Sequence, residues 1–375
     1  MNHPIRIPAN PKASPITRRL FTWLSSLADR TERKMLIGQF CGYPNPQPQL
    51  LAQTHPTSTF TPRYMEEIHA LTGRHPALMG VDYYGNTGGI DDGPDIVTTE
   101  HSHLRTLNHS DATGTAVHLN RELIAWWNAG GLVTISIHCY RPDTHQPNHS
   151  GGMMKFGFGN SDRFPADERF REYDLRRILP GGADRVNWEA MMDGMAAGLT
   201  ELRNAGVVVI WRPFHEVDKG WWWGKHDPAL FGQVWRDMFR RFSDQHRLDN
   251  LLWAYTGDPH QYPGDDLVDL VGNDNYNRQL TDRSLHDWTV QRGKLHAQTE
   301  FGFGIDALRD NSTASYDFAE LTASLRPWRP RSVYLLVWSD AWRIGNPRHL
   351  HQRELMEDPW IISREDMEQS WRTGT

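Results

Sequence analysis

The sequence predicts one α/β domain, a single (β/α)8 TIM barrel with long loops after strands 2 and 3. Its 375 residues suit one large barrel, although length alone also allows two average domains. Eight runs are nearly continuously apolar, as is typical of parallel strands that are covered on both faces. Helix-like segments separate most of them. The runs are Met35–Phe40, Pro76–Tyr83, Gly131–His138, Val207–Trp211, Asn250–Tyr255, Leu267–Asp274, Lys294–Glu300 and Ser332–Trp338.

The helical segments alternate with these runs as a barrel requires. Trp188–Asn204 precedes the fourth run, with Asn187 as its expected N-cap and Gly206 just past its end. Pro228–His246 has the clearest amphipathic pattern. We expect residues 1–34 to form an N-terminal arm and helix, and residues 35–375 to form the barrel. Further helices are expected at Arg121–Asn128 and Ser315–Leu325.

Composition excludes several classes of protein. The net charge of −6 argues against nucleic acid as a partner, because phosphate binding needs a basic face. No apolar run is long enough to span a membrane. Two cysteines, Cys41 and Cys139, do not make a disulfide scaffold, and we expect free thiols. We expect a monomer. The first 15 residues lack the apolar core of a signal peptide, so the protein stays in the cell or its leader is not in this sequence.

Two of the apolar runs lead to a glutamate. Glu216 follows the fourth run and Glu300 ends the seventh, 84 residues later, which equals three βα units of 28 residues. Both carboxyl groups therefore belong at the C-terminal face of the barrel, where the active sites of such barrels lie. A pair of carboxyl groups there is typical of enzymes that cut glycosidic bonds. The structural alternative is a salt bridge at each strand end.

The surroundings of the two glutamates differ. Glu216 lies between the aromatic stretch WRPFH and Val217, a dry setting that favours a neutral acid. Glu300 has Tyr276 and Arg212 as expected neighbours from other strands, which favours a carboxylate. The chain also contains 16 tryptophans. Many must fill the core, but others are candidates for stacking on the apolar face of a sugar ring.

The motifs around these residues resemble those of glycoside hydrolase family 26, which is best known for β-mannanases. The resemblance covers roughly Arg18 to Arg343. Its most specific part is an Arg-Pro-Phe-His-Glu signature with a tryptophan five residues later. The matching positions are Arg212 to Glu216 with Trp221, Thr299 to Gly302, Val271 to Asp274 with Tyr276, His138, and Trp338.

The resemblance implies a retaining endo-β-1,4-mannanase without metal or cofactor. Glu216 would be the acid/base and Glu300 the nucleophile. The other matched residues would bind substrate or position the nucleophile, although each is also compatible with plain packing. We expect Arg212 to line the site, Tyr276 to hydrogen-bond Glu300, His215 to contact the nucleophile or the neighbouring sugar hydroxyl, His138 to bind a sugar hydroxyl, Trp338 to floor the subsite, and Trp221 to stack near the cleavage point.

Some positions depart from the family pattern and leave the substrate open. Asp218-Lys219-Gly220 replaces the family's Asn-Gly, and Ser339 and Asp340 follow Trp338. The alternatives are therefore the same chemistry on a β-1,3-xylan, a mixed-linkage glucan or a bacterial exopolysaccharide, or a catalytically silent carbohydrate-binding barrel.

A metal-dependent hydrolase is the remaining alternative. It would use His101 and His103 in the loop after the second strand. Such a site needs further ligands at later strand ends, and strands five and six end on Tyr255 and Asp274, without a histidine. We therefore expect a solvated loop there.

Overall fold

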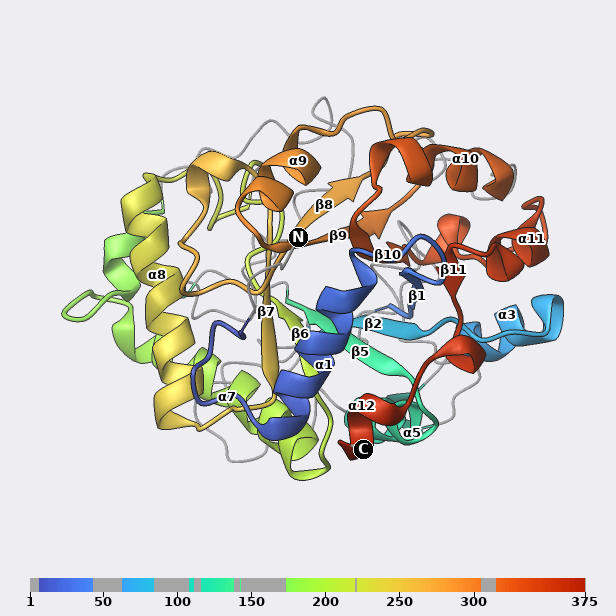
Figure 1. The fold of residues 1–375 in the computed structure, drawn as a ribbon. Coiled ribbons are helices and arrows are strands. Elements are labelled where there is room, and N and C mark those ends of the chain that lie inside the picture. The colour runs from blue at the N-terminus through green and yellow to red at the C-terminus, as the bar shows by residue number, and fades with distance from the viewer. Residues whose placement is uncertain are drawn as a thin grey trace.

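The predicted barrel is confirmed in the computed structural model, which describes residues 7–42, 63–83, 108–110, 116–137, 142, 173–219, 221–304 and 315–374. Eight parallel strands are hydrogen-bonded in chain order, and the last pairs with the first, so the sheet closes (Figure 1). The strands are β1 (Met35–Phe40), β2 (Leu78–Asp82), β5 (Leu132–Ser136), β6 (Val209–Arg212), β7 (Leu251–Thr256), β8 (Leu270–Asn275), β9 (Leu295–Phe301) and β10 (Ser332–Val337).

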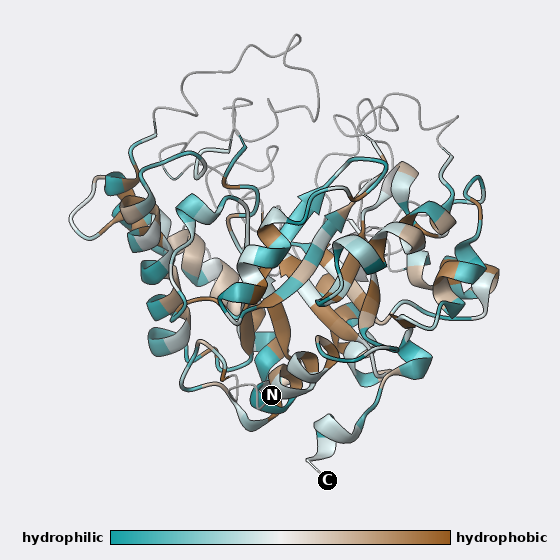
Figure 2. Ribbon diagram, turned by 45° about the horizontal axis from the view of Figure 1, so that its top comes forward, coloured by the Kyte–Doolittle hydropathy of each residue, from teal (hydrophilic) through white to brown (hydrophobic). Residues whose placement is uncertain are grey.

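The barrel strands are buried along almost their whole length. Seven of the eight are buried at every position, and only β8 becomes half-buried, over Asn273–Asn275 at its C-terminal end. Figure 2 shows the apolar colouring gathered on the central strands and the polar colouring on the outer helices. Helices outside and side chains inside cover both faces of the sheet, which explains the continuous apolar runs.

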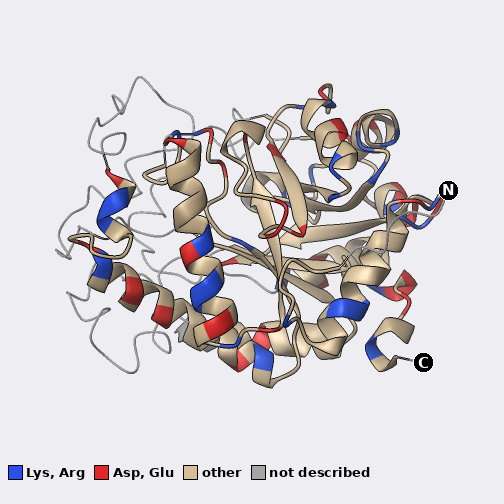
Figure 3. Ribbon diagram, turned by 60° about the vertical axis from the view of Figure 1, so that its left-hand side comes forward, with Lys and Arg blue, Asp and Glu red and all other residues tan. Residues whose placement is uncertain are grey.

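The outer helices are α3 (Arg63–Thr72), α5 (Leu119–Asn128), α7 (Arg185–Asn204), α8 (Pro228–Arg240), α9 (Ser284–Gln291) and α10 (Phe318–Trp328). The expected cap of α7 is wrong: Asp184 precedes the helix, and the Asn187 side chain instead donates to the Pro142 carbonyl at 2.9 Å. Helix α8 starts at Pro228, as its pattern predicts, with Asp227 as its N-cap, but it changes to a π-helical turn at Arg241–Gln245. Acidic and basic residues are interspersed along the outer helices (Figure 3).

The chain ends pack together at the N-terminal ends of the strands. Helix α1 (Pro15–Leu27) lies across this end of the barrel, where the Thr17 hydroxyl donates to the Asp249 carbonyl at 2.9 Å (Figure 1). Trp23 of α1 stacks on Trp371 of α12 (Ser370–Thr373), with ring centroids 5.8 Å apart. The C-terminal segment also contains α11 (Gln352–Glu357) and β11 (Ile361–Ile362), which pairs with β1 outside the closed barrel.

The two long connections start at the opposite, C-terminal ends of β2 and β5, and most of their residues lie outside the described part of the chain. Within the first, β3 (Asn108–Ser110) and β4 (Ala116–His118) form an antiparallel pair. Within the second, a 3-10 turn spans Leu175–Ile178. Cys41 is buried and free, and Cys139 lies outside the described residues. Among the helices that the structure describes, none has the length and hydropathy to cross a membrane.

Candidate active site

The site lies at the C-terminal ends of the barrel strands. Glu216 is four residues beyond the last residue of β6, and Glu300 is the penultimate residue of β9. Phe214 and Glu216 have φ angles of 50° and 54°, in the left-handed region that residues other than glycine seldom adopt. Such conformations cost about 1–3 kcal/mol each and persist where the surrounding structure enforces them. Here they turn the backbone beyond β6 sharply, and the Glu216 side chain lies over the barrel mouth.

Two donors from neighbouring strands hold the Glu300 carboxylate. One oxygen accepts from Nη2 of Arg212, and the other accepts from the Tyr276 hydroxyl at 2.6 Å. All three side chains are buried or nearly so. Hydrogen bonds to an ionised acceptor are stronger than neutral ones, so this arrangement stabilises Glu300 as a carboxylate. The expected contact between Tyr276 and Glu300 is thus present.

A third carboxyl group, Asp274 of β8, belongs to the same network. It accepts from Nη1 of Arg212 at 2.9 Å and from the Thr299 hydroxyl at 2.7 Å. The pairing of β8 with β9 skips Thr299, so that Asp274 lies directly opposite Glu300. Thr299 fits only because position 272 is glycine: a Cβ there would approach the Thr299 side chain to 2.3 Å.

Asp274 was recognised in the sequence as part of a motif but not as a site residue. Its position at the end of an apolar run, like that of the two glutamates, was the signal that could have identified it.

Aromatic side chains surround the Glu216 carboxyl group. The Trp221 indole N–H donates to Oε2 of Glu216 at 3.1 Å, and the Trp221 ring stacks on Trp223 with centroids 5.2 Å apart. The Trp223 indole donates to the His215 carbonyl at 2.8 Å, which fixes the strained turn. The His215 ring is buried and lies 5.7 Å from Trp221 and 5.9 Å from Trp223, between centroids.

The three carboxyl groups are close enough for their charges to interact. One oxygen each of Glu216, Asp274 and Glu300 lies within 4.8 Å of the others. Burial raises the pKa of all three to about 7. The Asp274 charge contributes to the raised pKa of Glu216, whereas Arg212 and Tyr276 act to lower that of Glu300. The two hydrogen bonds that Glu300 accepts from Arg212 and Tyr276 favour its ionised form, so they favour Glu216 as the holder of a retained proton.

This cluster offers three oxygens in reach of one cation, but a cation is already present. The Arg212 guanidinium bonds both Asp274 and Glu300 from within the barrel. The Arg212 guanidinium thus supplies positive charge beside both carboxyl groups. His101 and His103, the alternative metal pair, lie outside the described residues.

A cavity of about 300 Å³ opens beside Glu216. Its lining includes Asp258 and Asn273, at or near the C-terminal ends of β7 and β8, together with Asp218 and Lys219. Lys219 is ion-paired with Asp218 at 3.0 Å. Asp218 and Lys219 are two of the positions at which the sequence departs from the family pattern, so part of that departure lies on the cavity wall.

The remaining predicted residues are placed as follows. Trp338, just past β10, stacks on Phe40 with centroids 3.8 Å apart and meets the Tyr276 ring edge-on at 6.4 Å. It is therefore beside the residue that holds Glu300. His138 lies outside the described residues.

Comparisons with known proteins agree with the fold. The model of glycosyl hydrolase family 26 matches residues 9–366. A mannan endo-1,4-beta-mannosidase A and B of Caldalkalibacillus mannanilyticus is 29% identical over 96% of this chain, which spans 63% of that relative's length. A mannan endo-1,4-beta-mannosidase of Bacillus subtilis is 27% identical, over 95% of this chain and 88% of its own. A solved Bacillus subtilis mannanase structure superposes with a TM-score of 0.73, at 26% identity and 96% coverage of both chains. With the family model matching nearly its whole length, the chain belongs to glycosyl hydrolase family 26.

Proposed function

We propose that this protein is a retaining endo-β-1,4-mannanase. The observation that carries the proposal is the Glu216–Glu300 pair at one end of the barrel, in which one oxygen of each carboxyl group lies within 4.8 Å of the other. Retaining glycosidases need carboxyl groups about 5–5.5 Å apart, and inverting ones need about 6.5–9.5 Å to admit a water. The substrate is proposed from the named activity of the relatives described above.

In the first step, Glu300 attacks the anomeric carbon while Glu216 gives its proton to the leaving oxygen. Arg212 and Tyr276 favour the ionised form of Glu300, and the burial of Glu216, which raises its pKa to about 7, favours its protonated form. In the second step, Glu216 is a base: it takes a proton from water, which then releases the sugar from Glu300. The Trp221 indole stabilises the Glu216 carboxylate between the two steps.

The aromatic and histidine side chains would bind the sugar. Trp338, next to Tyr276, would floor the subsite that holds the attacked sugar, and Trp221 would stack near the cleavage point. His215 and His138 would bond hydroxyl groups beside the nucleophile. The Asp218–Lys219 pair on the cavity wall is the observation that favours the second candidate, the same chemistry on another β-linked polymer.

The test is a hydrolysis screen on mannan, glucomannan, β-1,3-xylan and lichenan with analysis of product lengths. The proposal expects mannan to be cut fastest into oligosaccharides of mixed length, and expects Glu300→Ala to abolish turnover. Glu354→Ala, an exposed position on α11, is the matched control and should retain full activity. Faster cleavage of another polymer would reassign the substrate. Full activity of Glu300→Ala, or no cleavage of any polymer by the unaltered protein, would contradict the proposed chemistry.

A further inference from the structure

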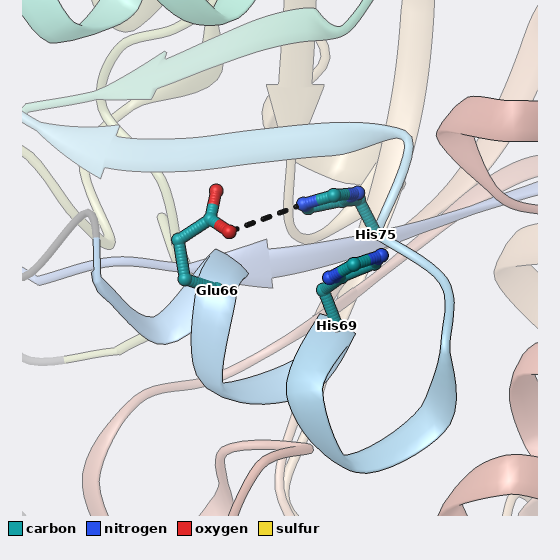
Figure 4. Close-up of side chains that lie close together, drawn as sticks. All are labelled: Glu66, His69 and His75. Atoms are coloured by element: carbon teal, nitrogen blue, oxygen red, sulfur yellow. Dashed lines mark hydrogen bonds and ion pairs between the residues drawn. The ribbon is translucent and has the colours of Figure 1, made fainter.

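A second group of ionisable side chains lies at the opposite end of the barrel. Glu66 and His69 are one turn apart on α3, and His75 is in the connection that leads into β2. Residues three apart on a helix share a face, so Glu66 and His69 point the same way. Figure 4 shows the two imidazole rings stacked beside the Glu66 carboxylate, each with one nitrogen on the carboxylate side.

The spacing of these groups suits a small divalent ion. One ligand atom from each of the three residues lies within 4.8 Å of the others. Nε2 of His75 is 3.4 Å from Oε2 of Glu66, which is long for a hydrogen bond. It is close to the edge of about 3.3–3.4 Å between two ligands of a tetrahedral zinc ion with bonds of about 2.0–2.1 Å.

The second ring nitrogen of His75, Nδ1, has a carboxylate partner, as histidine ligands in many zinc sites do. Its Nδ1 lies 2.7 Å from Oε1 of Glu365, and its backbone N–H donates to the other oxygen of Glu365 at 3.0 Å. A carboxylate on the second ring nitrogen commonly orients a histidine that binds a metal. With the proton on Nδ1, the lone pair of Nε2 is free and points towards Glu66.

Arg364 competes with Glu365 for a hydrogen bond to Nδ1 of His75. Its Nη2 lies 2.7 Å from the same Nδ1, while its guanidinium lies over the Trp126 ring. A neutral His75 cannot accept from Arg364 and donate to Glu365 through one nitrogen. A metal ion bound to Nε2 would favour the tautomer of His75 that carries its proton on Nδ1 and donates it to Glu365.

We propose that Glu66, His69 and His75 form a zinc-binding site, with water as the fourth ligand and Glu365 as the group that positions His75. Imidazole and carboxylate are ligands that zinc accepts readily. An ion can enter from solvent, because the Glu66 side chain is 68% exposed while that of His75 is 9% exposed.

Binding requires a small movement of His69. The two rings are nearly parallel, with centroids 4.0 Å apart and planes 10° apart, so their in-plane lone pairs cannot meet at one ion. His69 must tilt away from His75. The site would then join α3 to the C-terminal segment, which already contacts this region where Arg364 N donates to the His75 carbonyl at 3.0 Å.

The experiment is calorimetric titration of the full chain with ZnCl2 after chelator treatment, with Tm measured in parallel. We expect one tight site per chain and a Tm that rises with zinc concentration. Glu66→Gln and His69→Ala should each weaken binding more than tenfold, and Glu365→Gln by about 10–100-fold. Glu67→Gln removes a neighbouring helix carboxylate that pairs with Arg63 and should leave the affinity unchanged.

Two further measurements separate this site from the catalytic carboxylates. Glu300→Ala should bind zinc as tightly as the unaltered chain, and Co²⁺ should give the visible spectrum of a nitrogen-containing tetrahedral site that His69→Ala loses. Equal zinc affinity of His69→Ala and Glu67→Gln, or loss of the tight site in Glu300→Ala, would overturn the proposal.

Discussion

Removing the Tyr276 hydroxyl tests whether its hydrogen bond stabilises the ionised form of Glu300. In Tyr276→Phe, Glu300 loses the 2.6 Å hydrogen bond to one of its oxygens and keeps Arg212 on the other. A hydrogen bond to a charged group contributes about 1.5–3 kcal/mol, and about 1.4 kcal/mol corresponds to one pH unit. Because the bond stabilises the ionised form, its loss raises the pKa of Glu300, by about one to two pH units.

The assay is the pH dependence of kcat/KM for mannan hydrolysis. If Glu300 is the nucleophile and Glu216 the acid, activity needs Glu300 ionised and Glu216 protonated. The acidic limb should then move to higher pH, while the alkaline limb, which follows deprotonation of Glu216, should move little. Tyr316→Phe is the matched control, since that hydroxyl donates to the Arg278 carbonyl at 2.9 Å and not to Glu300. An acidic limb that stays in place in Tyr276→Phe, or moves equally in both variants, would refute the reasoning.

Three further perturbations act on the same cluster. Trp221→Phe removes a donor that lowers the pKa of Glu216, so the alkaline limb of kcat/KM should move up by about one pH unit; a downward move would contradict this. Glu216→Gln should raise Tm more at pH 8 than at pH 5. The folded-state pKa of Glu216 is raised from 4.5 to about 7, so the native chain loses stability as pH rises through that range. Equal increases in Tm at both pH values would contradict the view that the buried charge of Glu216 destabilises the folded chain. Arg212→Met leaves Glu300 and Asp274 buried without a cation, and chemical denaturation at pH 8 should show a loss of about 3–5 kcal/mol. The loss should be smaller at pH 5, where both carboxyl groups can take up protons, and an unchanged stability at pH 8 would argue against a buried ion pair.

The barrel could be predicted because its strands are buried on both faces, and such strands require continuous apolar runs in the sequence. All eight runs became barrel strands in the expected order. Strand β11 is two residues long and carries no such pattern. The start of α7 was misplaced by three residues because Asn187 is a good cap by type, while the chain uses it to hold Pro142.

Within the site, residue type and spacing predicted partners but not backbone geometry. The glutamates were found because each follows an apolar run, and the contact of Tyr276 with Glu300 came from the motif. The left-handed turn at Phe214 and Glu216 has no signature in a sequence that lacks glycine there. The zinc cluster escaped notice because Glu66 and His69 are ordinary surface residues of a helix until the fold brings His75 to them.

The most direct test of the central claim is the anomeric configuration of the first product. Proton NMR during early hydrolysis of mannan, before mutarotation, separates the α and β anomers of the new reducing end. Double displacement through Glu300 with Glu216 as acid/base predicts that the β anomer accumulates first. If the α anomer accumulates first, water attacks the sugar directly and Glu300 is not the nucleophile.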